Sequence, residues 1–123
     1  MRIVGIVLTW NEEKHLARCI ESISGVVDEI FIADCHSTDK TEQIAKDRGV
    51  RFKQHPWKNH ATQFNWALAQ LESDVDWVLR IDADEYLTPE PALEIQQKLA
   101  VIDDETQGIF LPRRMAYMGR LIQ

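Results

Sequence analysis

WVLRIDADE, residues 77–85, is an apolar run that ends on two aspartates one residue apart, Asp82 and Asp84. Its apolar side chains predict a buried strand, and because carboxylates are not buried without partners, we expect both aspartates at the strand's exit. In an open α/β sheet the carboxyl ends of the central strands form the ligand crevice, and clustered carboxylate oxygens suit Mg²⁺ or Mn²⁺. The stretch therefore predicts a divalent metal at Asp82 and Asp84 that holds a diphosphate.

The sequence on either side repeats a pattern of strand, turn and helix. Nearly continuous apolar runs predict further strands over residues 2–9, 29–34, 50–55 and 108–112. Apolar residues at helical spacing predict helices over residues 12–24 and about 60–71, one between residues 37 and 49, and one after Thr88. Asn11 is the expected N-cap of the first helix, and Gly49 is the expected residue after the second.

This alternation predicts an α/β fold. Parallel strands joined by right-handed helical crossovers form a mostly parallel sheet with helices on both faces. At 123 residues the chain is about one domain, residues 1–123. Residues 115–123 contain neither a capped helix nor a turn, so the partner of the last strand is undefined and we expect the fold to be incomplete at the C-terminus.

Composition and charge narrow the classes of function. The net charge of −6 argues against nucleic-acid binding, and the cluster of Arg113, Arg114 and Arg120 is expected to face water. Cys19 and Cys35 form no dense framework and no signal peptide precedes them, which favours a reduced, cytoplasmic setting without a disulfide. The opening apolar run is far shorter than the roughly 20 residues that span a bilayer, which leaves only peripheral membrane contact open.

Polar residues gather at one predicted edge of the sheet, because parallel strands share a direction. The loops after the first, second and fourth strands supply Thr9, Asn11, Glu12, Asp34, Ser37, Asp39, Asp82 and Asp84. Each residue alone has an ordinary explanation as a helix cap or turn residue. Together the carboxylates repel one another, and a bound cation relieves that repulsion; Mg²⁺ takes one or two carboxylates and completes its shell with water and phosphate.

Other familiar sites are missing from the sequence. No G-x-G-x-x-G follows the first strand and no G-x-x-x-x-G-K-[ST] occurs, so dehydrogenases and P-loop proteins are disfavoured, and a diphosphate would need metal as its counter-charge. No two histidines share a metal-ligand spacing, so all four are expected in surface or loop roles. Trp10 and Trp57 could stack on a base or sugar, but packing is the commoner use of tryptophan, and none of the four tryptophans is assigned to the site.

Three motifs in order closely resemble the family 2 inverting glycosyltransferases, which have the GT-A fold. They are TWNEE at residues 9–13, IADCHSTDKT at 32–41 and the D-x-D motif DADE at 82–85. HPW at 55–57 and QFNWAL at 63–68 are similar to the branch that builds lipopolysaccharide cores and related bacterial glycans. The resemblance covers nearly the whole chain and implies transfer of a sugar, with inversion, from a nucleotide-diphosphate sugar to a glycan or lipid-linked acceptor.

The resemblance also implies roles for single residues. It places Asp82 near the ribose and diphosphate and Asp84 on the Mg²⁺ or Mn²⁺, and it has Asp34 accept a hydrogen bond from the base. Asn65 matches a position near the nucleotide sugar, although the arginine that usually precedes it is Phe64 here. The remaining nucleotide-binding residues implied are Thr9, Asn11, Glu12, Ser37 and Ala83, with Ser37 and Asp39 also supporting their loop.

The general base that inversion needs is expected beyond Gln123, because the family places it after the D-x-D half and no acid following Glu85 lies in a matching motif. The acceptor-binding part is then absent, and the chain alone should be inactive or weakly active. Two alternatives stay open: a nucleotidyltransferase-like protein, which usually needs a Gly-rich basic loop, and a non-catalytic assembly module whose last strand pairs with another chain. The second would make the protein a homo-oligomer.

Overall fold

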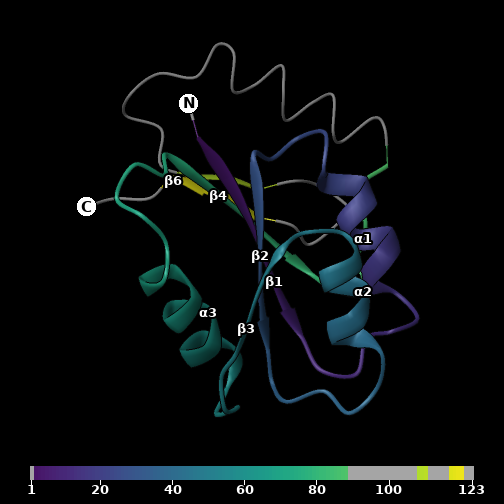
Figure 1. The fold of residues 1–123 in the computed structure, drawn as a ribbon. Helices are drawn as coiled ribbons and strands as arrows, with labels where there is room; N and C mark the ends of the chain where they lie inside the picture. Colours follow the sequence, from purple (N-terminus) through teal and green to yellow (C-terminus); the bar gives the residue numbers. More distant parts are fainter. Residues whose placement is uncertain (1, 89–107, 111–116, 121–123) are drawn as a thin grey trace.

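The computed structural model describes residues 2–88, 108–110 and 117–120, which form a six-stranded sheet in the order β3-β2-β1-β4-β6-β5 (Figure 1). The four strands β1 (Ile3–Thr9), β2 (Glu29–Asp34), β3 (Arg51–Gln54) and β4 (Trp77–Asp82) run parallel. β5 (Gly108–Phe110) and β6 (Tyr117–Arg120) are antiparallel to their neighbours. The carboxyl ends of the four parallel strands therefore lie at one edge of the sheet.

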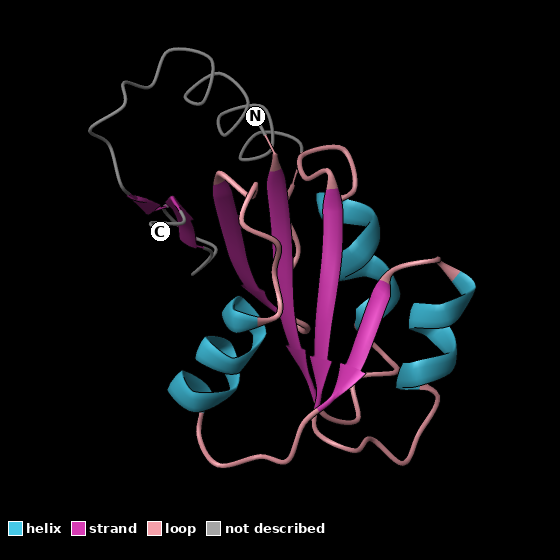
Figure 2. Cartoon of the chain, turned by 60° about the vertical axis from the view of Figure 1, so that its left-hand side comes forward, coloured by secondary structure: helices cyan, strands magenta, loops and turns pink. Residues whose placement is uncertain are grey.

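Helices cover both faces of this sheet (Figure 2). α1 (Leu16–Ile23) and α2 (Thr41–Asp47) pack on one face, and α3 (His60–Ala69) packs on the other. Gly5, at the middle of β1, allows α1 to approach closely, because a Cβ there would lie 3.0 Å from Cδ1 of Ile23. The mostly parallel α/β architecture predicted from the sequence is confirmed.

Residues of β1 contribute to two hydrophobic cores, one on each face of the sheet. Ile3 and Val7 of β1 lie under α1 and α2 in the core that contains the buried Trp77, whereas Val4 and Ile6 lie under α3. A strand covered on both faces needs apolar side chains at every position rather than at alternate ones. The uninterrupted apolar runs of the sequence are explained by this two-sided burial.

Helix starts are the least accurate part of the prediction. The first helix begins at Leu16 rather than residue 12, and Asn11 is not its N-cap; that position is His15, whose side chain forms no capping bond. The second helix begins at Thr41, where Asp39 Oδ1 accepts from the Thr41 backbone N–H at 2.9 Å. Gly49 follows it with a φ of 68°, as expected.

The end of the sheet also differs from the prediction. β5 confirms the start of the last expected strand, but β6 was not predicted, and it lies between β4 and β5. Its sequence, YMGR, is too short to show the apolar pattern of a strand, and the segment is held as a strand by its antiparallel pairing with β4. The helix predicted after Thr88 lies outside the described residues.

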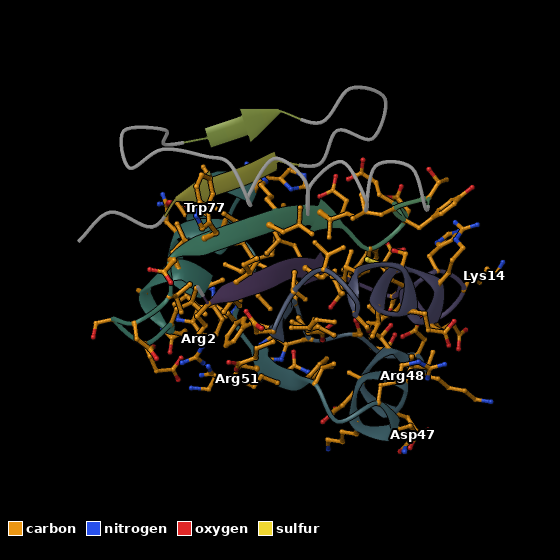
Figure 3. All side chains as sticks on the ribbon, turned by 90° about the horizontal axis from the view of Figure 1, so that it is seen from above. Arg2, Lys14, Asp47, Arg48, Arg51 and Trp77 are labelled. Atoms are coloured by element: carbon orange, nitrogen blue, oxygen red, sulfur yellow. The ribbon has the colours of Figure 1, made fainter. Side chains whose placement is uncertain are left out.

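A network of ion pairs joins the strands at the amino end of the sheet, around Arg2 and Arg51, which are labelled in Figure 3. Arg2, just before β1, pairs with Glu29 and binds Asp74 at 2.8 Å, while Arg51 binds both Glu29 and Glu72 at 3.0 Å. Glu29 therefore lies between two guanidinium groups and links β1, β2 and β3. Among the described residues no helix is both long and apolar enough to cross a membrane.

Candidate functional site

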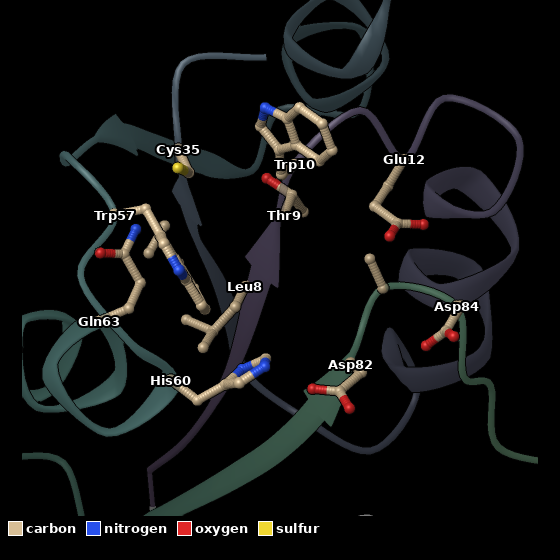
Figure 4. Close-up of a pocket in the computed structure, with 12 residues that line it drawn as sticks. Leu8, Thr9, Trp10, Glu12, Cys35, Trp57, His60, Gln63, Asp82 and Asp84 are labelled. Atoms are coloured by element: carbon tan, nitrogen blue, oxygen red, sulfur yellow. The ribbon is translucent and has the colours of Figure 1, made fainter.

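A cavity of about 520 Å³ opens at the carboxyl edge of the sheet (Figure 4). That volume lies within the range of about 300–1,000 Å³ typical of small-molecule sites. Its walls comprise Leu8, Thr9, Trp10, Glu12, Ala33, Cys35, Trp57, His60, Gln63, Asp82, Ala83 and Asp84. Five residues assigned to the site from the sequence line it: Thr9, Glu12, Asp82, Ala83 and Asp84.

The turn after β4 forms the acidic side of the cavity. Glu85 closes this turn, because its backbone N–H donates to the Asp82 carbonyl at 2.9 Å and its carboxylate accepts from the Asp82 N–H at 2.9 Å. Ala83 lies between Asp82 and Asp84 in this turn, and its side chain is buried. Its burial fixes the position of the turn that carries the two aspartates. Burial, together with the charges of Asp82 and Asp84, raises the pKa of Glu85 above its ordinary value.

This acidic turn suits a metal ion that takes some of its ligands from the protein and the others from a substrate. Neither Asp82 nor Asp84 forms an ion pair with a residue that the structure describes. Within the described parts of the chain no three His, Cys, Asp or Glu side chains gather closely enough to hold an ion by themselves. Two carboxylates on one wall match the demand of Mg²⁺, which fills its remaining positions with water and phosphate oxygens.

Asp34 joins the ends of β1 and β2 from inside the protein. Its side chain is fully buried, and Oδ1 accepts from Thr9 Oγ1 at 2.6 Å and from the Ser37 hydroxyl. Oδ2 accepts from the Ser37 backbone N–H at 2.7 Å. In this structure Asp34 and Ser37 join the ends of β1 and β2 without lining the cavity. The hydrogen bond that Asp34 would accept from a base stays a prediction.

The loops after β1 and β2 are bound to each other. Asn11 adopts a φ of 50°, its backbone N–H donates to Ser37 Oγ at 2.8 Å, and its Oδ1 accepts from the Thr38 N–H at 2.8 Å. Asp39 accepts from the Glu13 and Thr41 backbone N–H groups. Burial alone would raise the pKa of Asp39, but the hydrogen bond from the Thr41 hydroxyl, together with those from the backbone N–H groups, outweighs burial and lowers it. Asn11 and Asp39 thus fix the loops that present Thr9 and Glu12.

Among the residues assigned to the site from the sequence, Asn65 alone lies on α3. It is exposed on α3 and does not line the cavity. The residue before Asn65 is Phe64, which stands where the resemblance implies an arginine. The guanidinium group of Arg80, from β4, lies over the Phe64 ring at 4.9 Å from the ring centre, so a cation lies beside this position. The role of Asn65 near a nucleotide sugar stays a prediction.

The aromatic side of the cavity was not predicted from the sequence. Trp10 and Trp57 were expected to pack, but they are 61% and 46% exposed and both line the cavity. His60 and Gln63, from α3, line it too. The signal that could have found both tryptophans is their position, because Trp10 directly follows β1 and Trp57 comes shortly after β3, at the same edge as the aspartates.

Comparison with known proteins identifies the family. The sequence pattern of the group described as glycosyl transferase family 2 matches residues 6–120. The chain belongs to glycosyl transferase family 2. An uncharacterised glycosyltransferase of Rickettsia typhi is 39% identical over 121 residues, which are 98% of this chain and 38% of that protein.

A second relative carries a more specific name. The lipopolysaccharide core biosynthesis glycosyltransferase LpsC of Rhizobium meliloti is 37% identical over 119 residues, which are 92% of this chain and 42% of LpsC. This family 2 chain therefore spans about two fifths of the length of both relatives. The resemblance inferred from the three motifs is confirmed.

Solved structures confirm the GT-A fold. Glucosyl-3-phosphoglycerate synthase of Mycobacterium tuberculosis, in complex with Mn²⁺ and uridine-diphosphate-glucose, superposes with a TM-score of 0.74 at 21% identity over 97% of this chain and 56% of that one. Residues 1–349 of TarS from S. aureus superpose with a TM-score of 0.62 at 25% identity over 81% of this chain and 32% of that one.

Proposed function

We propose that this chain is the donor-binding part of a metal-dependent, inverting glycosyltransferase. It binds a nucleotide-diphosphate sugar, and Asp84 and Asp82 hold the Mg²⁺ or Mn²⁺ that binds the diphosphate. The observation that carries the proposal is the cavity at the carboxyl edge of the sheet, where these two carboxylates lack a described cationic partner in a chain of family 2. The family membership also favours this function over that of a nucleotidyltransferase.

The chemistry divides between the metal and the chain. A bound divalent ion supplies the positive charge that offsets the negative charge of the departing diphosphate. Asp82 and Asp84 would hold that ion, and Thr9 and Glu12 line the pocket beside it. Ala83, between the two aspartates, is buried. We assign Asn11, Asp34 and Ser37 to holding the nucleotide loops, since their hydrogen bonds join those loops. Asn65 would approach the donor sugar from α3.

The acceptor follows from similarity to LpsC rather than from the cavity. We propose a glycan or lipid-linked acceptor of the lipopolysaccharide-core type, which would bring the protein to the inner face of the membrane through peripheral contact. Because the relatives are longer, we assign residues 1–123 to donor binding and place the acceptor-binding part and the general base outside this chain. The chain alone is then expected to bind donor but to transfer sugar weakly or not at all.

Calorimetry tests the metal and donor assignments together. UDP should bind the chain in the presence of Mn²⁺, and EDTA should abolish the binding. Asp84→Ala should weaken binding by roughly tenfold to a hundredfold, because it removes one of the two carboxylates that would hold the ion. Asp47→Ala removes the same charge from the far end of α2 and should leave UDP affinity unchanged. Equal UDP affinity in Asp84→Ala and the unmodified chain would reject the metal assignment.

A further inference from the structure

The cavity has two chemically different sides. The β4 side carries the carboxylates of Asp82 and Asp84, whereas the side formed by residues after β3 and by α3 carries Trp57, His60 and Gln63 (Figure 4). The sheet order places β2 and β1 between β3 and β4, so these two sides lie across the cavity from each other. A nucleoside diphosphate has the same division, with an anionic end and a flat, uncharged aromatic end.

Trp57 is held with its indole open to the cavity. Its ring meets the imidazole of His60 edge-on, with centres 4.8 Å apart and planes at 90°. The structure describes three exposed large apolar side chains, and two of them, Trp10 and Trp57, line this one cavity. An exposed indole at a cavity wall offers a stacking surface for a flat ring.

Gln63 adds a directed donor beside that indole. Its side chain is 1% exposed, Nε2 donates to the His55 carbonyl at 3.3 Å, and Oε1 lies 2.7 Å from His55 Nδ1. A carbonyl oxygen only accepts, so the amide nitrogen must face His55 O and the orientation is fixed. The His55 ring is itself stacked on Trp66 at 4.3 Å. No described acceptor takes the second hydrogen of Gln63 Nε2.

Asp34 does not line the cavity in the structure, and its carboxylate only accepts hydrogen bonds, so a donor to the base must come from another residue. We propose that Trp57 and Gln63 recognise the nucleobase of the donor: the indole stacks on the base, and Nε2 of Gln63 donates to an exocyclic carbonyl oxygen. The inference rests on the proposed function and deepens it. It predicts preference for uracil, cytosine or guanine over adenine, which has no such oxygen.

Calorimetry in the presence of Mn²⁺ separates the two ends of the ligand. The probes are UDP, ADP and inorganic pyrophosphate, which has no base. Trp57→Ala should weaken UDP binding about tenfold or more, and Trp57→Phe should retain most of the affinity. Pyrophosphate affinity should be unchanged in both variants. Gln63→Met should remove the preference for UDP over ADP while it leaves pyrophosphate binding intact, which also reports that the fold is retained.

Four outcomes would overturn the inference. UDP affinity unchanged in Trp57→Ala would exclude stacking on this indole, and equal affinity of the unmodified chain for UDP and ADP would exclude reading by Gln63; both leave the proposed function standing. Failure of the unmodified chain to bind UDP with Mn²⁺ would reject the proposed function and this inference together. A parallel loss of UDP and pyrophosphate affinity in Trp57→Ala would show damage to the metal end instead of loss of base contact.

Discussion

The two ends of the sheet treat their carboxylates in opposite ways. At the amino end Glu29 lies between Arg2 and Arg51. Glu72 binds both of these arginines, and Asp74 binds Arg2. At the carboxyl end Asp82, Asp84 and Glu85 gather on one turn, and no lysine or arginine in the described residues forms an ion pair with them. At the amino end the chain supplies cationic partners for its acids, and at the carboxyl end the described residues supply none by ion pairing.

The pKa directions express the same difference. Burial alone would raise the pKa of Glu29, but hydrogen bonds and charge from Arg2 and Arg51 outweigh burial and lower it. The pKa of Glu85 is raised by burial and by its acidic neighbours. A lowered pKa thus marks an acid whose negative charge the fold stabilises, and a raised pKa marks an acid whose charge the fold disfavours. An acid of the second kind is expected where an external cation binds.

The largest expected effect is stabilisation of the carboxyl end by ligand. With free UDP at a hundred times its dissociation constant and Mn²⁺ present, the free energy of unfolding should rise by about 2.7 kcal/mol. The double variant Asp82→Asn, Asp84→Asn should show no rise, while Glu29→Gln should show the full rise because it lies at the other end. Urea unfolding followed by circular dichroism measures this, and a rise in the double variant would contradict the assignment.

The next effect concerns the paired end without ligand. Glu29→Gln removes the charge between two guanidinium groups and should lower the free energy of unfolding by about 1 kcal/mol, since a network is worth more than a single surface pair. Glu21→Gln is the matched control, because Glu21 meets Arg48 at 3.3 Å on an exposed surface and should cost less than about 0.5 kcal/mol. Equal losses in urea unfolding would show that the network has no special value.

Burial on both faces made the strands predictable. β1 and β2 match the predicted ranges to within one residue. Their short, continuous apolar runs are the pattern of a strand that is buried on both faces. β6 was missed because its four residues contain a glycine and form a strand only through pairing with β4. The start of α1 was missed because Asn11 is used by the loop after β2 instead of by a helix.

Some residues of the site could likewise be predicted from a single stretch of sequence, whereas others depend on contacts between distant segments. Asp82 and Asp84 could be found because the change from apolar to acidic residues is written in one stretch of sequence. Asp34 was correctly placed at the end of β2, but its enclosure by Thr9 and Ser37 depends on two loops meeting. Gln63 belongs to the QFNWAL stretch, but that stretch did not predict its place in the cavity, since only the fold of the β3–α3 segment brings its amide to the carbonyl of His55.

The smallest effect is the pH dependence, and it has opposite signs at the two ends. The pKa of Glu29 lies below its ordinary value of 4.5, so its contribution is present above pH 4.5 and is lost as the pH falls through the folded-state pKa. The pKa of Glu85 lies above 4.5, so the folded protein binds that proton more tightly, and stability is lost as the pH rises through the folded-state pKa. Glu29→Gln should therefore flatten the fall of Tm on acidification, whereas Glu85→Gln should flatten the loss above pH 4.5 and keep the acceptor for the Asp82 N–H. Thermal unfolding from pH 3 to 7 measures both slopes, and two variants that change the curve in the same direction would show that the ends do not differ in the way described.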